Sequence, residues 1–177
     1  MILGAVLAGG RSTRFGSDKA LAELGGRTLL ARAVDALAAQ CDAVVVVGRE
    51  EAPVPTLPDW PCADMGPLGG IAAALHHARD AGYDEVLTCS VDSFGLGEGL
   101  AAQLQPAPSY CESQPVIGLW PASVSAKLDA LLTSDARHSM RAFAELVGAR
   151  AVRLYENPAN INTPADLMAA EEQSHGL

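Results

Sequence analysis

The chain has 177 residues, of which 49% are hydrophobic and 19% are charged, and its formal net charge at pH 7 is −9. A chain of this length and apolar content can bury a complete core, so we expect a single domain over residues 1–177. The acidic balance disfavours nucleic-acid binding, because negative surface charge repels a phosphate backbone. Any anion that this protein binds must therefore be held by a local site.

No stretch of the sequence approaches the roughly 18 consecutive apolar residues of a membrane span. The apolar start, residues 2–7, lacks the preceding basic residues of a signal peptide. The cysteines lie far apart and without metal-ligand spacing, which favours reduced thiols over disulfides or a zinc site. They are Cys41, Cys62, Cys89 and Cys111. We expect a cytoplasmic protein that has no membrane contact.

The first half of the chain alternates strand-like and helix-like segments. Short apolar runs typical of strands buried on both faces occupy residues 2–7, 43–47 and 85–91. Between them, apolar residues recur at helical spacing over residues 29–37 and 70–81. This order predicts a three-layer α/β/α fold, doubly wound and Rossmann-like, with a mainly parallel sheet.

The second half of the chain has a looser pattern. It predicts a helix over residues 96–104, a strand over 116–120, helices over 124–132 and 140–147, and a strand over 151–154.

The last helix has a clear start signal. Thr163 can act as its N-cap, Pro164 suits the first helical position, and Asp166 completes an arrangement similar to a capping box. The sequence therefore predicts a helix that begins at Pro164.

A glycine-rich, basic loop follows the first predicted strand. Gly9 and Gly10 come where the chain must turn beside any ligand bound beyond the carboxyl end of that strand. Arg14 and Lys19 can add charge-assisted hydrogen bonds to phosphate oxygens. The spacing matches neither a P-loop nor a GxGxxG dinucleotide loop. The loop is consistent with triphosphate binding, and two glycines alone are also compatible with a simple solvated turn.

Several segments in order resemble the signature motifs of nucleotidyltransferases that activate small phosphorylated molecules with a nucleoside triphosphate. Within that superfamily the chain is most similar to the molybdenum cofactor guanylyltransferase family. The segments are residues 7–10, 14–16, 18–19, 24–30, 66–70, 91–92, 115–120 and 160–164.

This resemblance implies the nucleotidyltransferase type of α/β fold and a specific reaction. The family transfers GMP from GTP to the terminal phosphate of molybdenum-molybdopterin, releasing pyrophosphate and forming the guanine dinucleotide cofactor. Such a reaction asks the protein to align two anions and to stabilise charge with cations and a metal, here Mg²⁺. The family also implies transient contact with molybdenum-insertion or cofactor-accepting proteins.

The resemblance also implies roles for individual residues. Arg14, Lys19 and Asp92 are carried over as catalytic residues, and Asp92 also as the Mg²⁺ ligand. The nucleotide-binding residues are Leu7, Ala8, Gly9, Gly10, Lys19, Asp59 and Asp92. From position alone, Asp59 and Asp92 could equally be turn-forming aspartates.

The segment after Asp92 departs from the family pattern. The family usually continues with a small residue and proline, whereas this chain has Ser93 and Phe94. The missing proline predicts a less rigid loop on the metal side of the site.

Asn160 and Asn162 correspond to asparagines on the side of the family's site that receives the pterin phosphate. Asparagines before an N-cap are also ordinary turn residues, so that alternative stays open. Trp120 is expected to pack in the core rather than to stack on a base. No histidine falls in a ligand or catalytic pattern.

Two alternative functions stay open beside guanylyl transfer. One is nucleotidyl transfer to another acceptor, such as cytidylyl transfer to molybdopterin or transfer to a sugar phosphate. The other is a nucleotide-binding homologue with weakened catalysis, suggested by the altered segment after Asp92 and by a contracted stretch over residues 105–114. The Ala-Gly-Gly at residues 8–10 resembles the guanine-using branch, so guanylyl transfer is favoured.

Overall fold

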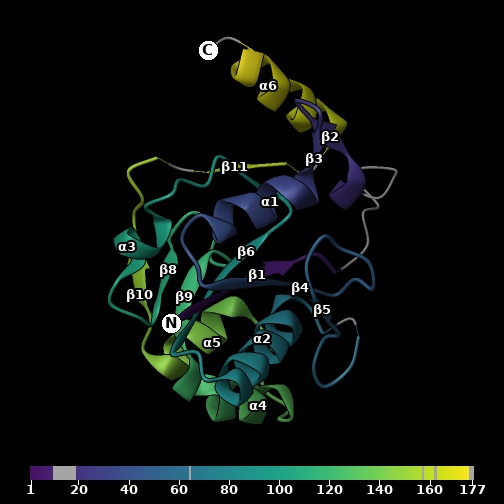
Figure 1. Ribbon diagram of the computed structural model, residues 1–177. Helices are drawn as coiled ribbons and strands as arrows, with labels where there is room; N and C mark the ends of the chain where they lie inside the picture. The colour runs from purple at the N-terminus through teal and green to yellow at the C-terminus, as the bar shows by residue number, and fades with distance from the viewer. Residues whose placement is uncertain (10–18, 64, 157, 162, 176–177) are drawn as a thin grey trace.

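The computed structural model describes residues 1–9, 19–63, 65–156, 158–161 and 163–175, and it is built on a central sheet with helices on both faces (Figure 1). Every neighbouring pair in this sheet is parallel except the two pairs that involve β9. In spatial order the strands are β10 (Arg150–Val152), β8 (Ser109–Cys111), β9 (Gly118–Pro121), β6 (Glu85–Ser90), β1 (Ile2–Leu7), β4 (Ala43–Val47) and β5 (Thr56–Leu57). The predicted mainly parallel sheet is confirmed.

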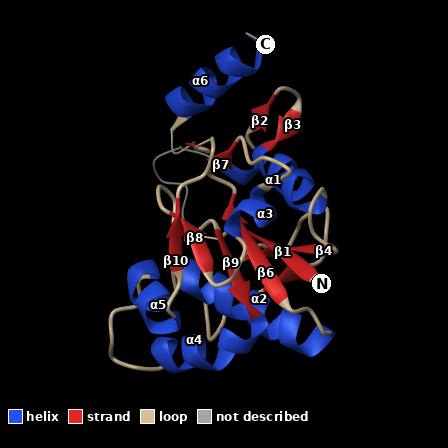
Figure 2. Ribbon diagram, turned by 90° about the vertical axis from the view of Figure 1, so that its left-hand side faces the viewer, coloured by secondary structure: helices blue, strands red, loops and turns tan. Residues whose placement is uncertain are grey.

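Helices cover both faces of the sheet, as Figure 2 shows from a second side. One face carries α1 (Leu29–Ala38) and α3 (Leu100–Leu104), and the other carries α2 (Pro67–Ala81), α4 (Ser125–Leu132) and α5 (Met140–Val147). Short 3₁₀ turns occupy Lys19–Leu21 (η1) and Ala122–Val124 (η2). These layers form the predicted three-layer α/β/α arrangement.

Three small elements lie beyond the carboxyl end of β1. The hairpin of β2 (Glu23–Leu24) and β3 (Arg27–Thr28) precedes α1, and α6 (Pro164–His175) packs beside this hairpin (Figure 1). The two-residue strands β7 (Ser93–Phe94) and β11 (Ala159–Asn160) pair antiparallel with each other.

The side chains of β1 alternate between two cores. Leu3 and Ala5 belong to the core on the α2 side, whereas Val6 belongs to the core on the α1 side. All three are completely buried. Gly4 faces α1, where an added Cβ would lie only 3.1 Å from Leu37 Cβ. This burial on both faces explains why the sequence of β1 is a continuous apolar run rather than an alternating one.

Trp120 of β9 lies in the core, as its size suggested. Its exposed fraction is 0%, its ring centroid lies 4.7 Å from that of Phe143, and its Nε1 donates to Thr88 Oγ1 at 3.1 Å. A Cβ added to Gly118 would come within 2.5 Å of Trp120 Cζ2. The indole therefore fills a closely fitted space, and its Nε1–H has a hydrogen-bond acceptor there.

The predicted bounds are wrong at several elements of the second half. The helix predicted over residues 96–104 begins only at Leu100, after Gly95, Gly97 and Gly99, because glycine disfavours helix. The strand predicted over residues 116–120 occupies Gly118–Pro121 instead, because Ile117 closes a turn through its N–H to the carbonyl of Gln114.

The start of α6 is confirmed in detail. Thr163 N–H donates to Asp166 Oδ2 at 3.0 Å, and Asp166 N–H donates to Thr163 Oγ1 at 3.2 Å. These reciprocal bonds are those of a capping box, and Pro164 occupies the first helical position.

All four cysteines are free, in agreement with the sequence. Burial raises the pKa of the Cys41 thiol to about 12, and burial likewise raises the pKa of Cys89. These thiols stay protonated near neutral pH and behave as core groups. Among the described helices, none combines the length and the apolar character that crossing a membrane requires.

Candidate active site

The carboxyl ends of β1, β4 and β6 bring the candidate residues to one edge of the sheet. Leu7 ends β1 and is paired with Val47 of β4 on one side and Ser90 of β6 on the other. The next residue, Ala8, donates its N–H to the carbonyl of Val47 at 2.9 Å. Gly9 therefore lies between the turns that follow the two neighbouring strands, which is where open α/β sheets bind ligands.

Gly9 is in close contact with Gly48, the residue that follows β4. A Cβ added to Gly48 would lie 2.7 Å from both the Cα and the N of Gly9. Gly48 also has a φ of +90°, in the region that L side chains disfavour. Only glycine lets the two strand ends approach this closely. Gly48 was not predicted as a site residue, although a glycine directly after a predicted strand was the available signal.

We expect Gly48→Ala to weaken nucleotide binding as well as stability. The new methyl group would displace Gly9, so GTP affinity should fall about tenfold or more, and the free energy of unfolding should fall by about 2–4 kcal/mol. Nucleotide titration and denaturant unfolding of the same preparation measure both effects.

Gly82→Ala is the matched control. Gly82 ends α2 with a φ of +84°, and an added Cβ meets nothing within 4 Å. This variant should lose about 1 kcal/mol of stability and keep its GTP affinity. Equal GTP affinities in the two variants would contradict the role assigned to the Gly9–Gly48 contact.

Asp59 lies beside the same strand end. A Cβ at Gly9 would be 3.7 Å from Asp59 Oδ2, and one at Gly70 would be 3.7 Å from Asp59 Oδ1. Gly70 is in the first turn of α2. A Cβ added to Gly70 would lie 2.8 Å from Leu7 Cδ2, so the close approach of α2 to β1 depends on glycine at this position. The structure therefore brings the Asp59 carboxylate to Gly9 and the start of α2.

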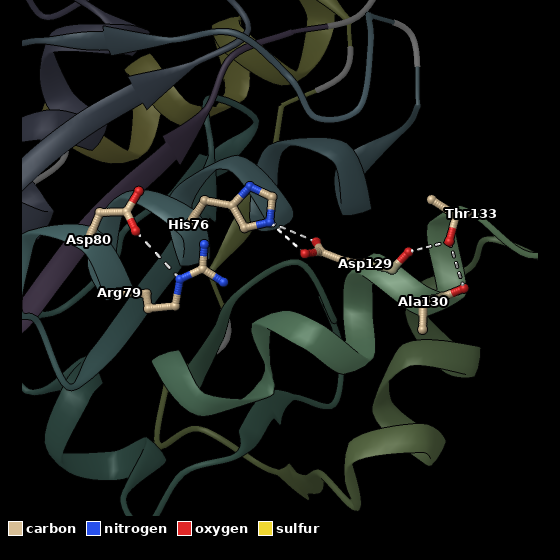
Figure 3. Close-up of polar contacts among 6 residues, drawn as sticks. All are labelled: His76, Arg79, Asp80, Asp129, Ala130 and Thr133. Atoms are coloured by element: carbon tan, nitrogen blue, oxygen red, sulfur yellow. Dashed lines mark hydrogen bonds and ion pairs between the residues drawn. The ribbon is translucent and has the colours of Figure 1, made fainter.

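The loop that carries Asp59 contacts α2 through Trp60, which packs against His76, and His76 in turn pairs with Asp129 of α4. The indole of Trp60 meets the ring of His76 edge-on, with centroids 4.8 Å apart. His76 Nε2 lies 2.8 Å from each carboxylate oxygen of Asp129, and an ionised carboxylate can only accept, so the imidazole N–H donates. Figure 3 shows this contact between α2 and α4. His76 thus has a structural partner, and sequence analysis did not foresee the contact.

Asp92 and Asn160 lie in neighbouring segments beyond β6, the strand that pairs with β1 on the side opposite β4. Asp92 follows β6 by two residues, and its carbonyl accepts a hydrogen bond from the N–H of Ile161 at 2.7 Å. Ser93 and Asn160 are directly opposite in the β7–β11 pair. Residues separated by almost seventy positions in sequence are therefore neighbours. The segment after Asp92 is also held in a strand pair, whereas the missing proline had predicted a less rigid loop.

Asp92 is the candidate metal ligand at this edge. Among the described residues, no group of three or more His, Cys, Asp or Glu side chains could hold a metal by itself. Asp92 is a partly buried carboxylate at a strand end. A single carboxylate fits Mg²⁺, which keeps several waters and takes other ligands from substrate phosphates.

Some of the predicted residues lie outside the part of the chain that the structure describes. They are Gly10, Arg14 and Asn162, and for Lys19 the backbone is described but not the side chain.

Comparison with known proteins identifies the family of this chain. The model of the MobA-like NTP transferase domain matches residues 4–153. The chain belongs to the MobA-like NTP transferase family. It is 37% identical over 197 aligned positions to a Rhizobium leguminosarum bv. trifolii protein named molybdenum cofactor guanylyltransferase, and the match covers 99% of this chain and 94% of that protein.

Solved structures of low identity share the MobA-like fold. Molybdopterin-guanine dinucleotide biosynthesis protein A from Archaeoglobus fulgidus matches with a TM-score of 0.71 and 19% identity, covering 100% of both chains. The 2-C-methyl-D-erythritol 4-phosphate cytidylyltransferase of Thermus thermophilus matches with a TM-score of 0.63 and 16% identity, over 99% of this chain and 98% of that one. Proteins named for guanine and for cytidine nucleotides thus share this fold. The family match and the 37% identical relative show that the chain is a nucleotidyltransferase.

Proposed function

We propose that this MobA-like enzyme transfers GMP from GTP to the terminal phosphate of molybdenum-molybdopterin. The observation that carries the proposal is the 37% identity, over nearly the whole of both chains, to a protein named molybdenum cofactor guanylyltransferase. The fold alone cannot select the nucleotide, because proteins named for other nucleotides share it.

The proposed reaction is a substitution at the α-phosphorus of GTP. An oxygen of the acceptor's terminal phosphate attacks that phosphorus, the bond to the bridging oxygen of the β-phosphate breaks, and pyrophosphate leaves with the electron pair. The protein must align two anions and stabilise the charge on the leaving group. Arg14 and Lys19 are the proposed cations for this task, and Leu7, Ala8, Gly9 and Gly10 would place backbone groups beside the nucleotide.

Asp92 would hold Mg²⁺, the proposed cofactor. When bound, the metal supplies Lewis-acid stabilisation of the phosphate charge. Asp92 is suited to this role because it lies at the carboxyl end of β6, beside the strand end that carries Gly9.

Asp59 is the proposed guanine-binding residue. Its carboxylate lies beside Gly9, where the base of a bound nucleotide could reach it. A carboxylate accepts hydrogen bonds, and guanine presents N–H donors at N1 and at its exocyclic N2. This pairing would favour GTP over nucleotides that lack two adjacent donors.

The acceptor would bind on the side of Asn160 and Asn162. Asn160 is exposed and lies opposite Ser93, next to the proposed metal ligand. The free cysteines are consistent with the cytoplasmic location expected for such an enzyme. Transient contact with molybdenum-insertion or cofactor-accepting proteins is part of this proposal, as the family resemblance implies.

We expect GTP with Mg²⁺ to raise the melting temperature more than ATP, CTP or UTP with Mg²⁺. A ligand at 100 times its dissociation constant stabilises the native state by about 2.7 kcal/mol, which corresponds to a shift of roughly 5–10 °C for a chain of this size. The same panel, with molybdopterin present or absent, should release pyrophosphate only with GTP and acceptor together.

Each alternative has its own signature in this panel. A larger shift with CTP would favour cytidylyl transfer, and equal shifts with all four nucleotides would contradict guanine recognition. A GTP-specific shift without pyrophosphate release would instead indicate a homologue that binds the nucleotide and has lost catalysis.

A further inference from the structure

The side chain of Gln114 joins two segments that are far apart in the sequence. Its Nε2 donates to the carbonyl of Pro158 at 2.7 Å, and its Oε1 accepts a hydrogen bond from the hydroxyl of Ser93 at 3.1 Å. Ser93 directly follows Asp92, and Pro158 lies two residues before Asn160. One amide therefore connects the turn of the proposed metal ligand to the strand of the proposed acceptor residue.

Gln114 is itself held firmly in the loop between β8 and β9. Its carbonyl accepts from the N–H of Ile117 at 2.9 Å, and the carbonyl of Ile117 accepts from the N–H of Cys111 at 2.7 Å. Ile117 is completely buried. The hydroxyl of Thr88 in β6 donates to the neighbouring carbonyl of Val116 at 2.6 Å. These bonds fix the base of the Gln114 side chain against the central sheet.

Within the described residues, the two segments that Gln114 joins are paired through the short β7–β11 ladder and the bond from Ile161 N–H to the carbonyl of Asp92. The β7–β11 ladder has two residue pairs, and Ala159 and Asn160 are both exposed. A ladder this short is marginal without additional contacts. The amide of Gln114 supplies one hydrogen bond to each segment, and both bonds are partly shielded from water.

We propose that Gln114 is a positioning residue for guanylyl transfer, and that it acts by holding Asp92 and Asn160 in register. It would touch neither substrate, because its amide is engaged with Ser93 and Pro158. The inference rests on the proposed function. In this chain a side-chain amide from another loop connects the residue after Asp92 to the segment that leads into β11. Alignment of two reacting anions depends on small displacements, so loss of this amide should impair turnover.

The kinetic test compares Gln114→Ala with Gln103→Ala. Gln114→Ala should lower kcat about tenfold and raise the KM for molybdopterin, and the KM for GTP should change less, because Gln114 bonds to Ser93 and Pro158 rather than to Gly9 or Asp59. Gln103 Oε1 accepts a hydrogen bond from the N–H of Tyr155 at 3.0 Å, a similar bond to a nearby segment. Gln103→Ala should therefore retain wild-type kinetics.

Two further variants keep the test decisive if Gln114→Ala folds poorly. Gln114→Glu can still accept from Ser93 but, when ionised, has no donor for Pro158, so its defect should resemble that of Gln114→Ala. Ser93→Ala keeps the bond to Pro158 and should show a smaller defect, about threefold in kcat. Wild-type kinetic constants in both variants would overturn the proposal, as would a lower thermal midpoint with unchanged kinetics in Gln114→Ala.

Amide hydrogen exchange tests the bridge without any substrate. The Ile161 N–H is protected by the carbonyl of Asp92, so its exchange should be about tenfold faster in Gln114→Ala and unchanged in Gln103→Ala. If Ile161 exchanged faster in Gln114→Ala while the unchanged protein released no pyrophosphate, the structural role of Gln114 would stand and the proposed function would be wrong. Unchanged exchange at Ile161 would overturn the positioning role.

Discussion

Replacing Asp92 with alanine is expected to lower the rate of guanylyl transfer about 1000-fold in a protein that remains folded. The rate should fall because stabilisation of developing phosphate charge by a bound metal is worth several kcal/mol in such reactions. The fold should persist because the N–H and carbonyl of Asp92, which bond to Ser90 and Ile161, are retained in alanine. Asp92→Asn should show a similar loss, since the amide is a poor Mg²⁺ ligand.

Pyrophosphate release under saturating GTP and acceptor measures this effect, with Mg²⁺ varied over a wide range. Asp80→Ala is a suitable control, because Asp80 is exposed on α2 and pairs with Arg79 at 3.5 Å. The control should have wild-type turnover. If Asp92→Ala retained turnover within a few-fold, the assignment of Asp92 as the metal ligand would be wrong.

Trp120→Ala should cause a large loss of stability, about 3–5 kcal/mol in the free energy of unfolding. The substitution empties the space between Thr88, Gly118 and Phe143 and removes the donor that satisfies Thr88 Oγ1. Many domains are stable by only about 5–15 kcal/mol, so the variant should unfold at markedly lower denaturant concentration. Circular dichroism in a urea series measures the midpoint independently of tryptophan fluorescence.

Trp60→Ala serves as the comparison for this experiment. Trp60 is only partly buried and packs edge-on against His76, so its loss should cost less stability. Trp120 pairs with Val86 near the start of β6, at the far end from Asp92. Folded Trp120→Ala should therefore bind GTP normally. Weakened binding with unchanged stability would support a base-stacking role and contradict the packing role.

The central strands could be predicted because their own residues determine them. β1 and β4 have the predicted bounds. Both are continuous apolar runs, which is the pattern of strands that are buried on both faces of a sheet. The start of α6 was also predictable, because capping uses side chains within three residues of one another. Local physical chemistry is sufficient for such elements.

The shortest strands could not be predicted in this way. β5, β7 and β11 have two residues each, so no periodicity exists to detect, and their pairing depends on partners elsewhere in the chain. The same limit applies to the site. Gly9 and Asp92 could be named from their motifs, whereas the contact of Gly48 with Gly9 and that of Gln114 with Ser93 exist only once the chain is folded.

Because β9 is the strand that runs against its neighbours, the connection from β8 to β9 is a hairpin whose loop, residues 112–117, opens at the same edge as Gly9 and Asp92. A hairpin loop can lengthen without disturbing the strands that flank it, and doubling its length costs only about 0.6 kcal/mol in closure entropy. The loop can therefore take insertions at the same edge of the sheet as the candidate site. For an engineer, an insertion in this loop must spare Gln114 and Ile117, because their hydrogen bonds connect the loop to Ser93, Pro158 and Cys111.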